Sequence, residues 1–136
     1  MNLKELLIKH EALKLTPYLD SEGILTVGVG RNLERPISNK LAMFMLDEDI
    51  ESAKKDASNF EWFSELNETR QTVILDMLFN LGLSRFMGFK KTIKAINAGE
   101  YLKASQEMLD SKWARQVGHR AVELSMMMES GEDQNV

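Results

Sequence analysis

The sequence contains no cysteine among its 136 residues. Its fold therefore cannot depend on disulfide bonds, and we expect it to form in a reducing cytoplasm and in an oxidising periplasm alike. Histidines are also scarce: His10 and His119 stand far apart in the sequence, and no run of carboxylates has the spacing of a calcium loop. We therefore expect neither a metal site nor a cofactor.

The sequence also has no excess of basic charge and no long apolar run. Its formal net charge is −4, whereas domains that bind nucleic acids carry basic patches, so we expect no nucleic-acid partner. Residues 1–10 are charged and amphipathic, which predicts no signal peptide and no stable insertion in a membrane. The composition is that of an ordinary globular protein, and the length is typical of a single domain.

The first segment, from Asn2 to about Leu13, has the pattern of an amphipathic helix. Asn2 and Glu5 have the spacing of a capping box, in which each side chain accepts a hydrogen bond from the backbone of the other residue. Leucines recur at helical spacing and form one apolar face. Glu11 falls at the border of this face, where removal from water disfavours a charged carboxylate.

A short β region follows this helix. The residues from Asp20 to Gly23 are typical of a turn. Ile24 to Val29 is predicted to be a strand, with Thr16 to Leu19 as its hairpin partner. Gly28 and Gly30 weaken a strand, but they allow a ligand or another part of the chain to approach the backbone closely.

The rest of the sequence is predicted to be helical after a loop from Arg31 to Ile37. Ser38 has the features of a helix N-cap, and it precedes a long helix from Asn39 to about Ala57. We therefore expect one domain over residues 1–136, with a small β lobe at about 14–37, a linking helix at about 38–57 and a helical lobe at about 58–136. The helices predicted within that lobe are Glu68 to Leu81, Lys90 to Asn97, Glu100 to Asp110 and Ala121 to Met128.

Two carboxyl groups in contrasting surroundings are the main chemical feature. Hydrolysis of a glycosidic bond usually needs one carboxylic acid that donates a proton and one carboxylate that activates water or stabilises positive charge. Glu11 and Asp20 fit these roles in outline, and the Thr26 hydroxyl could hold a water against Asp20. Taken singly, each has a simpler explanation: a solvated surface charge, a turn residue and a residue with β propensity.

The spacing of Glu11, Asp20 and Thr26 resembles that of the phage lysozyme family, glycoside hydrolase family twenty-four, which includes the lysozymes of the T-even phages. The resemblance covers nearly the whole chain, in order. The matching stretches are His10-Glu11-Ala12-Leu13, Tyr18-Leu19-Asp20, Gly23 through Thr26-Val27-Gly28-Val29-Gly30, Phe79-Asn80-Leu81-Gly82, Trp113-Ala114-Arg115-Gln116, Arg120-Ala121 and Gly131.

This resemblance implies an α+β, mostly helical, lysozyme-like fold. A small β-hairpin lobe and a helical lobe would be joined by the long helix, and the first helix would pack with the helical lobe. Glu11 would be the general acid, and Asp20 and Thr26 would position and activate the attacking water in an inverting hydrolysis. The implied substrate is the β-1,4 bond between N-acetylmuramic acid and N-acetylglucosamine in peptidoglycan.

Three further residues are expected to bind substrate by the same resemblance. Phe79 and Asn80 match positions that line the cleft, although Phe79 fits a plain core position equally well. Arg120 matches an arginine close to the catalytic glutamate. Two departures from the T-even pattern concern the small lobe: Arg31 stands where those lysozymes have histidine, and the stretch from Leu33 to Ser38 is much shorter than theirs.

The resemblance also implies a biological setting. We expect a monomeric endolysin that acts on peptidoglycan glycan strands. It would accumulate in the host cytoplasm before lysis and reach the cell wall in the periplasm after a holin-type protein opens the membrane. Two other hypotheses remain open. One is a peptidoglycan-binding or structural module, such as a piece of a phage particle, and the other is a transglycosylase that forms an anhydro sugar.

Overall fold

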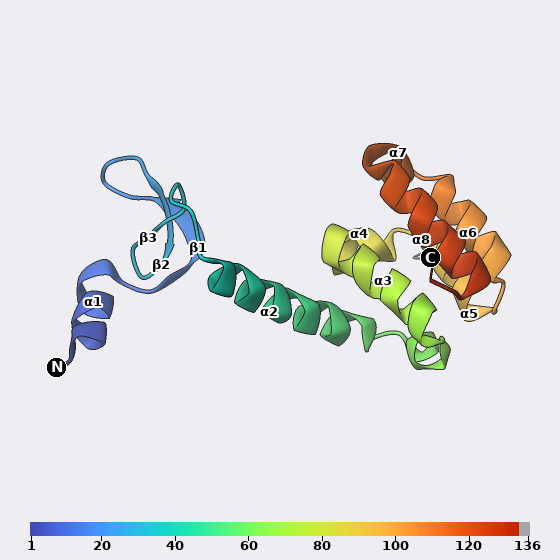
Figure 1. The fold of residues 1–136 in the computed structure, drawn as a ribbon, viewed down its shortest axis with the longest axis horizontal. Coiled ribbons are helices and arrows are strands. Elements are labelled where there is room, and N and C mark those ends of the chain that lie inside the picture. The colour runs from blue at the N-terminus through green and yellow to red at the C-terminus, as the bar shows by residue number, and fades with distance from the viewer. Residues whose placement is uncertain (134–136) are drawn as a thin grey trace. The chain divides into compact units, whose positions relative to one another are not determined.

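The computed structural model describes residues 1–133 and divides the chain into two compact units, Met1–Met43 and Phe44–Val136. The first unit contains one helix and a small sheet, and the second is helical (Figure 1). The long helix α2 (Asn39–Ala57) begins in the first unit and continues into the second. Its predicted N-cap is confirmed, because the Ser38 Oγ accepts a hydrogen bond from the Leu41 N–H at 3.0 Å.

Helix α1 (Leu3–Glu11) begins at the predicted capping box. The Asn2 side chain accepts a hydrogen bond from the Glu5 N–H at 2.8 Å, and the Glu5 carboxylate accepts one from the Asn2 N–H at 3.3 Å. The helix ends two residues earlier than predicted, because Ala12 has φ 67° and ψ 162°, a backbone conformation that cannot continue a helix. No residue of α1 is buried.

The predicted hairpin is confirmed and carries a third strand. β1 (Lys14–Leu19) and β2 (Leu25–Gly28) pair antiparallel, with Tyr18 opposite Thr26. The expected loop from Arg31 was wrong at its start, because β3 (Arg31–Asn32) pairs antiparallel with β2. The positive φ angles of Gly28 and Gly30 allow the tight return that brings β3 back alongside β2.

The second unit contains the predicted helices and three short ones that were not predicted. The first group agrees with prediction to within two residues at each end, and comprises α3 (Glu68–Leu81), α5 (Lys90–Asn97), α6 (Tyr101–Leu109) and α8 (His119–Ser130). The second group comprises η1 (Glu61–Glu65), α4 (Leu83–Met87) and α7 (Lys112–Val117). Each of these has only five or six residues, too few for hydrophobic periodicity to show.

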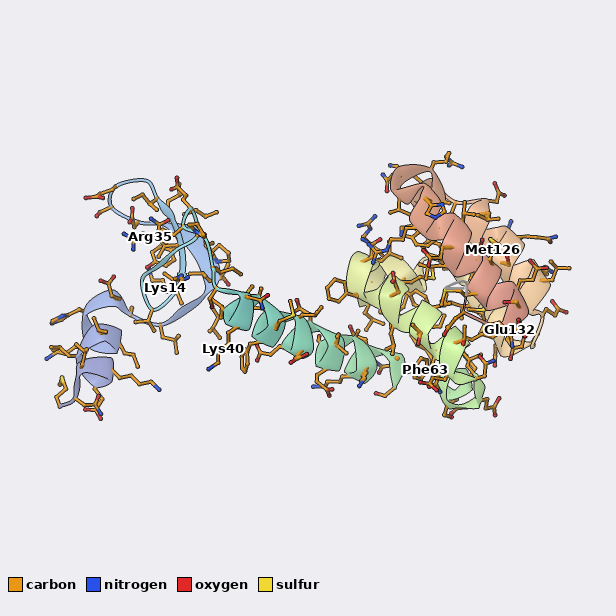
Figure 2. All side chains as sticks on the ribbon, in the orientation of Figure 1. Lys14, Arg35, Lys40, Phe63, Met126 and Glu132 are labelled. Atoms are coloured by element: carbon orange, nitrogen blue, oxygen red, sulfur yellow. The ribbon has the colours of Figure 1, made fainter. Side chains whose placement is uncertain are left out.

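The hydrophobic core lies entirely in the second unit. Within residues 1–133, every buried hydrophobic residue falls between Ala53 and Met128. Trp62 and Trp113 are both buried members of this core, which makes them packing residues. On α8, Met128 is fully buried, whereas Met126, which is labelled in Figure 2, is exposed. In residues 1–43, by contrast, Thr26 is the one buried residue.

The predicted fold class is confirmed, since a small antiparallel sheet accompanies a mostly helical chain. The arrangement of the two lobes, with the first helix against the helical lobe, stays a prediction. Across residues 1–133, none of the helices combines the length and the apolar character needed to cross a membrane.

Asn67 joins the start of α3 to the end of α8. Its Oδ1 accepts a hydrogen bond from the Arg70 N–H at 2.9 Å and so caps α3. Its Nδ2 donates to the Gly131 carbonyl at 3.0 Å, just beyond α8. Arg70 makes a parallel link, donating from Nε to the Met128 carbonyl at 2.7 Å.

Replacing Asn67 should separate these two contributions. Asn67→Ala removes the cap and the amide donor, and we expect it to lower the free energy of unfolding by about 1–2 kcal/mol. Asn67→Asp keeps the capping oxygen and should cost less. Urea unfolding followed by circular dichroism measures both, and equal losses for the two variants would contradict the capping role.

Candidate active site

Asp20 fixes the turn between β1 and β2 with its side chain. Its Oδ1 accepts hydrogen bonds from the Glu22 N–H at 2.8 Å and the Ile24 N–H at 2.9 Å. The Asp20 N–H in turn donates to the Ile24 carbonyl at 2.9 Å. Gly23, at φ 79°, completes the turn in a conformation that other residues rarely adopt. The Asp20 carboxyl group is therefore held at a defined place beside the end of β1.

Thr26 lies on β2, the middle strand of the sheet, and is only 4% exposed. Its hydroxyl donates to the Ile24 carbonyl at 2.8 Å. Because a hydroxyl has one hydrogen, the Thr26 oxygen can act only as an acceptor toward any further group. Ile24 thus connects the two residues: its N–H binds Asp20 and its carbonyl binds Thr26.

Glu11 is the last residue of α1, and its carboxyl group lies directly over the turn between β2 and β3. A Cβ placed on Gly30 would stand 2.6 Å from Glu11 Oε2 and 2.7 Å from Glu11 Cδ. The Glu11 side chain is exposed, so the removal from water expected at an apolar helix border is not observed. The next residue, Ala12, has a positive φ, a strained conformation of the kind that gathers at functional sites.

The structure thus brings the three predicted catalytic residues into one compact unit. Glu11 comes from α1, Asp20 from the β1–β2 turn and Thr26 from β2. The predicted substrate-binding residues Phe79, Asn80 and Arg120 all lie in the other unit.

Arg120 of α8 binds Asp76 of α3 in the structure. Its Nε and Nη2 donate to Asp76 Oδ1 at 2.9 and 2.7 Å. Both side chains are more than a third exposed, so this ion pair contributes about 1 kcal/mol or less to stability. The pair holds the Arg120 guanidinium group against Asp76, and the expected proximity of Arg120 to Glu11 stays a prediction.

Asp76 was not expected from the sequence, and the structure places it with two of the predicted substrate-binding residues, Phe79 and Arg120, in the lining of one groove. It precedes Phe79 and Asn80 by three and four residues on α3, so the three share one face of the helix. That spacing, with an acid one turn before a matched motif, was the signal that could have revealed it.

Phe79 borders a groove and is not a core residue. It is 46% exposed and forms part of a cavity of about 390 Å³ that is mainly apolar. The lining comes from α2, α3 and α8, and consists of Leu46, Ile50, Ala53, Thr72, Leu75, Asp76, Phe79 and Arg120.

Asn80 is anchored to the core through its side-chain oxygen. Its Oδ1 accepts a hydrogen bond from Trp113 Nε1 at 2.8 Å, which leaves the amide nitrogen as a possible donor to another group. Trp113 also lines a second, larger cavity of about 610 Å³. The lining includes two carboxylates, Glu107 and Asp110, and four cations that have no ion pair within the described part of the chain: Arg85, Lys90, Lys91 and Lys112.

The acidic charge of the chain is not spread evenly. Residues 1–43 carry six Lys or Arg against five Asp or Glu, whereas residues 44–136 carry 11 against 16, so the excess of negative charge lies in the second unit. Lys14, Arg35 and Lys40, labelled in Figure 2, are among the six cations. Lys14 Nζ lies 4.2 Å from the centre of the Tyr18 ring. The unit that holds the three predicted catalytic residues is thus not repelled strongly by an anionic polymer.

The predicted catalytic residues offer two carboxyl groups and one hydroxyl group. Within residues 1–133, no three His, Cys, Asp or Glu side chains gather in a way that would hold a metal ion. A carboxyl group over one turn of a small sheet, with a carboxyl group and a hydroxyl on the hairpin of the same sheet, is suited to acid–base chemistry with water.

Several known proteins are similar to this chain over nearly its full length. Probable T4-type lysozyme 1 of Dictyostelium discoideum is 25% identical over 161 aligned residues, which cover 96% of this chain and 95% of that protein. The pre-baseplate central spike protein Gp5 of Enterobacteria phage T4 is 25% identical over 162 residues, which cover 96% of this chain and 28% of Gp5. Both alignments are longer than this chain, so they contain gaps in its sequence.

A third similar protein is the SAR-endolysin of Escherichia phage Mu. It is 30% identical over 122 residues, which cover 86% of this chain and 68% of the endolysin. The model of the family described as phage lysozyme matches residues 8–127, a stretch that includes all six predicted site residues. A match of this extent shows that the chain belongs to the phage lysozyme family.

Proposed function

We propose that this protein is a muramidase that hydrolyses the β-1,4 bond between N-acetylmuramic acid and N-acetylglucosamine in peptidoglycan. The family and the names of its relatives indicate a glycosidase with a muramidase or endolysin role. The observation that carries the proposal is the gathering of Glu11, Asp20 and Thr26 in one unit, with Glu11 over one turn of the sheet and the other two on its hairpin.

In the proposed reaction, Glu11 is the general acid. Its carboxylic acid form donates a proton to the oxygen of the glycosidic bond as the bond from that oxygen to the anomeric carbon breaks. The leaving sugar then departs as a neutral alcohol, and Glu11 is left as a carboxylate. The exposed position of the Glu11 carboxyl group suits contact with a polymer that enters from solvent.

Asp20 and Thr26 are proposed to hold the attacking water. The Thr26 oxygen can only accept a hydrogen bond from a water, because its own hydrogen is donated to Ile24. Asp20 has one oxygen bound by backbone N–H groups, so its second oxygen can accept the other hydrogen of the water. A water held by both hydrogens presents its lone pairs to the sugar, and Asp20 takes its proton as the new carbon–oxygen bond forms.

The second unit is proposed to bind the rest of the substrate. The free amide nitrogen of Asn80 is suited to the carbonyl oxygen of an acetamido group, and Phe79 offers an exposed apolar face. Arg120, oriented by Asp76, supplies a fixed cation. Around the cavity beside Trp113, four unpaired cations outnumber the two carboxylates, and this excess suits the carboxylates of the peptide stems on the glycan.

We further propose that α1 packs with the helical lobe, as the resemblance to the family implies. The apolar residues of α1 are exposed in the structure, and Leu7 is 44% exposed. A surface helix normally buries its apolar stripe.

The stability effect of Leu7→Ala tests this packing. If α1 packs with the helical lobe, the substitution should lower the free energy of unfolding by about 2–5 kcal/mol, the usual cost of truncating a buried leucine. Leu15→Ala, at a site on β1 that is 84% exposed, is the control and should change it by less than about 0.5 kcal/mol. Similar small effects at both positions in urea unfolding would refute the packing.

The biological role that we propose is host-cell lysis by a monomeric endolysin. The protein would accumulate in the host cytoplasm and act on the wall in the periplasm after a holin-type protein opens the membrane. One observation favours a second candidate, a peptidoglycan-degrading part of a phage particle: the chain is similar to part of a central spike protein.

Clearing of permeabilised Gram-negative cells tests the proposed activity. Wild-type protein should lower the turbidity of the suspension, and Glu11→Gln should reduce the rate by about 100-fold or more, because it removes the proton donor. Glu34→Gln, which removes an exposed carboxylate of the same unit, is the matched control and should clear at the wild-type rate.

A binding module would behave differently in the same experiment. It would sediment with purified sacculi but release no soluble muropeptides. That result for wild-type protein on several peptidoglycan types, or full activity of Glu11→Gln, would refute the muramidase proposal.

A further inference from the structure

We propose that Gly30 is a positioning residue for Glu11, and that its lack of a side chain allows the carboxyl group to rest on the β2–β3 turn. This inference rests on the proposed function, in which Glu11 is the general acid. The site then has two requirements: the acid must be present, and the residue beneath it in the turn must have no side chain.

The contact between the two residues is very close. A Cβ on Gly30 would lie 2.6 Å from Glu11 Oε2, 2.7 Å from Cδ and 2.9 Å from Cγ, whereas ordinary contacts lie at 3.4–4 Å. All three atoms belong to the end of the Glu11 side chain, which is exposed and free to swing into solvent. Even the smallest side chain at position 30 would therefore move the carboxyl group away from the turn, while the backbone of α1 could stay in place.

The positive φ of Gly30 is not the only reason why a side chain is unfavourable at this position. Gly30 has φ 64° and Gly28 has φ 71°, so a substitution strains the backbone at both. The surroundings differ, however, because a Cβ on Gly28 would meet nothing within 4 Å. Gly28 is the last residue of β2 and Gly30 lies in the turn that follows. Substitutions at the two positions therefore compare strain alone with strain plus displacement of Glu11.

Displacement of the carboxyl group should act on proton transfer. A general acid must lie within hydrogen-bonding reach of the oxygen that it protonates. A shift of about 1 Å from a productive geometry costs on the order of 100-fold in rate. Since Gly30 is proposed to act through Glu11 and not by touching the sugar, the loss should appear in kcat while KM stays near its wild-type value.

The experiment compares Gly30→Ala with Gly28→Ala, using soluble peptidoglycan fragments as substrate. Both variants should lose similar thermal stability, because both carry an L-residue at positive φ. We expect Gly30→Ala to lower kcat by about 30- to 100-fold with KM within about twofold, and Gly28→Ala to stay within about threefold of wild type in both. A drop in kcat of equal size in the two variants would overturn the proposal, because strain would then explain the effect.

A measurement that does not depend on activity completes the test. The side-chain carboxyl carbon of Glu11 can be followed by NMR in ¹³C-labelled protein, with its resonance assigned by its loss in Glu11→Gln. It should move in Gly30→Ala and stay in place in Gly28→Ala, and an unchanged resonance in Gly30→Ala would overturn the proposal.

The two readouts also separate failure of this inference from failure of the proposed function. Active wild-type protein with unchanged kcat in Gly30→Ala refutes the positioning role alone. Inactive wild-type protein refutes the muramidase proposal and, with it, the role of Gly30 in positioning a general acid, even if the resonance moves.

Discussion

The carboxyl group of Asp20 closes the hairpin on which the rest of the candidate site depends. By accepting the N–H groups of Glu22 and Ile24, it fixes the turn that sets β2 beside β1. That pairing places Thr26 on the middle strand, and the turn after β2 then presents Gly30 to Glu11. The same carboxyl group that we propose as the base is thus also the element that orders the local chain. The proposed reaction and the local fold therefore depend on the same side chain, that of Asp20.

The hydrophobic core and the three predicted catalytic residues lie in different units. All buried hydrophobic residues of the described chain lie between Ala53 and Met128, whereas residues 1–43 are held largely by backbone pairing, caps and turns. A segment this short and this poorly buried is not expected to be stable alone. Proposed packing of α1 with the helical lobe would supply the missing burial. The two units also differ in charge, because the excess of acidic residues lies in the second unit.

Local features of the fold could be predicted from the sequence, whereas contacts between distant residues could not. The Asn2 capping box, the Asp20 turn and the Ser38 cap were each recognisable, because a short-range hydrogen bond selects particular residue types at fixed spacing. The two-residue strand β3 and the short helices lack enough length for a periodic pattern. The pairing of Arg120 with Asp76 joins residues 44 positions apart, and no pattern of neighbouring residues predicts such a pair. Gly30 was noticed as a place of close approach, but only the structure names Glu11 as its neighbour.

The stereochemistry of the first product tests the central claim most directly. If Glu11 donates a proton while Asp20 and Thr26 direct a water to the opposite face of the sugar, cleavage of a β bond must give the α anomer first. Proton NMR of the reducing end, recorded within the first turnovers and before mutarotation, distinguishes the outcomes. The account predicts an initial α anomer that later equilibrates. An initial β anomer would show retention through a covalent or shielded intermediate, and a 1,6-anhydro sugar would show that water does not attack, so either would contradict it.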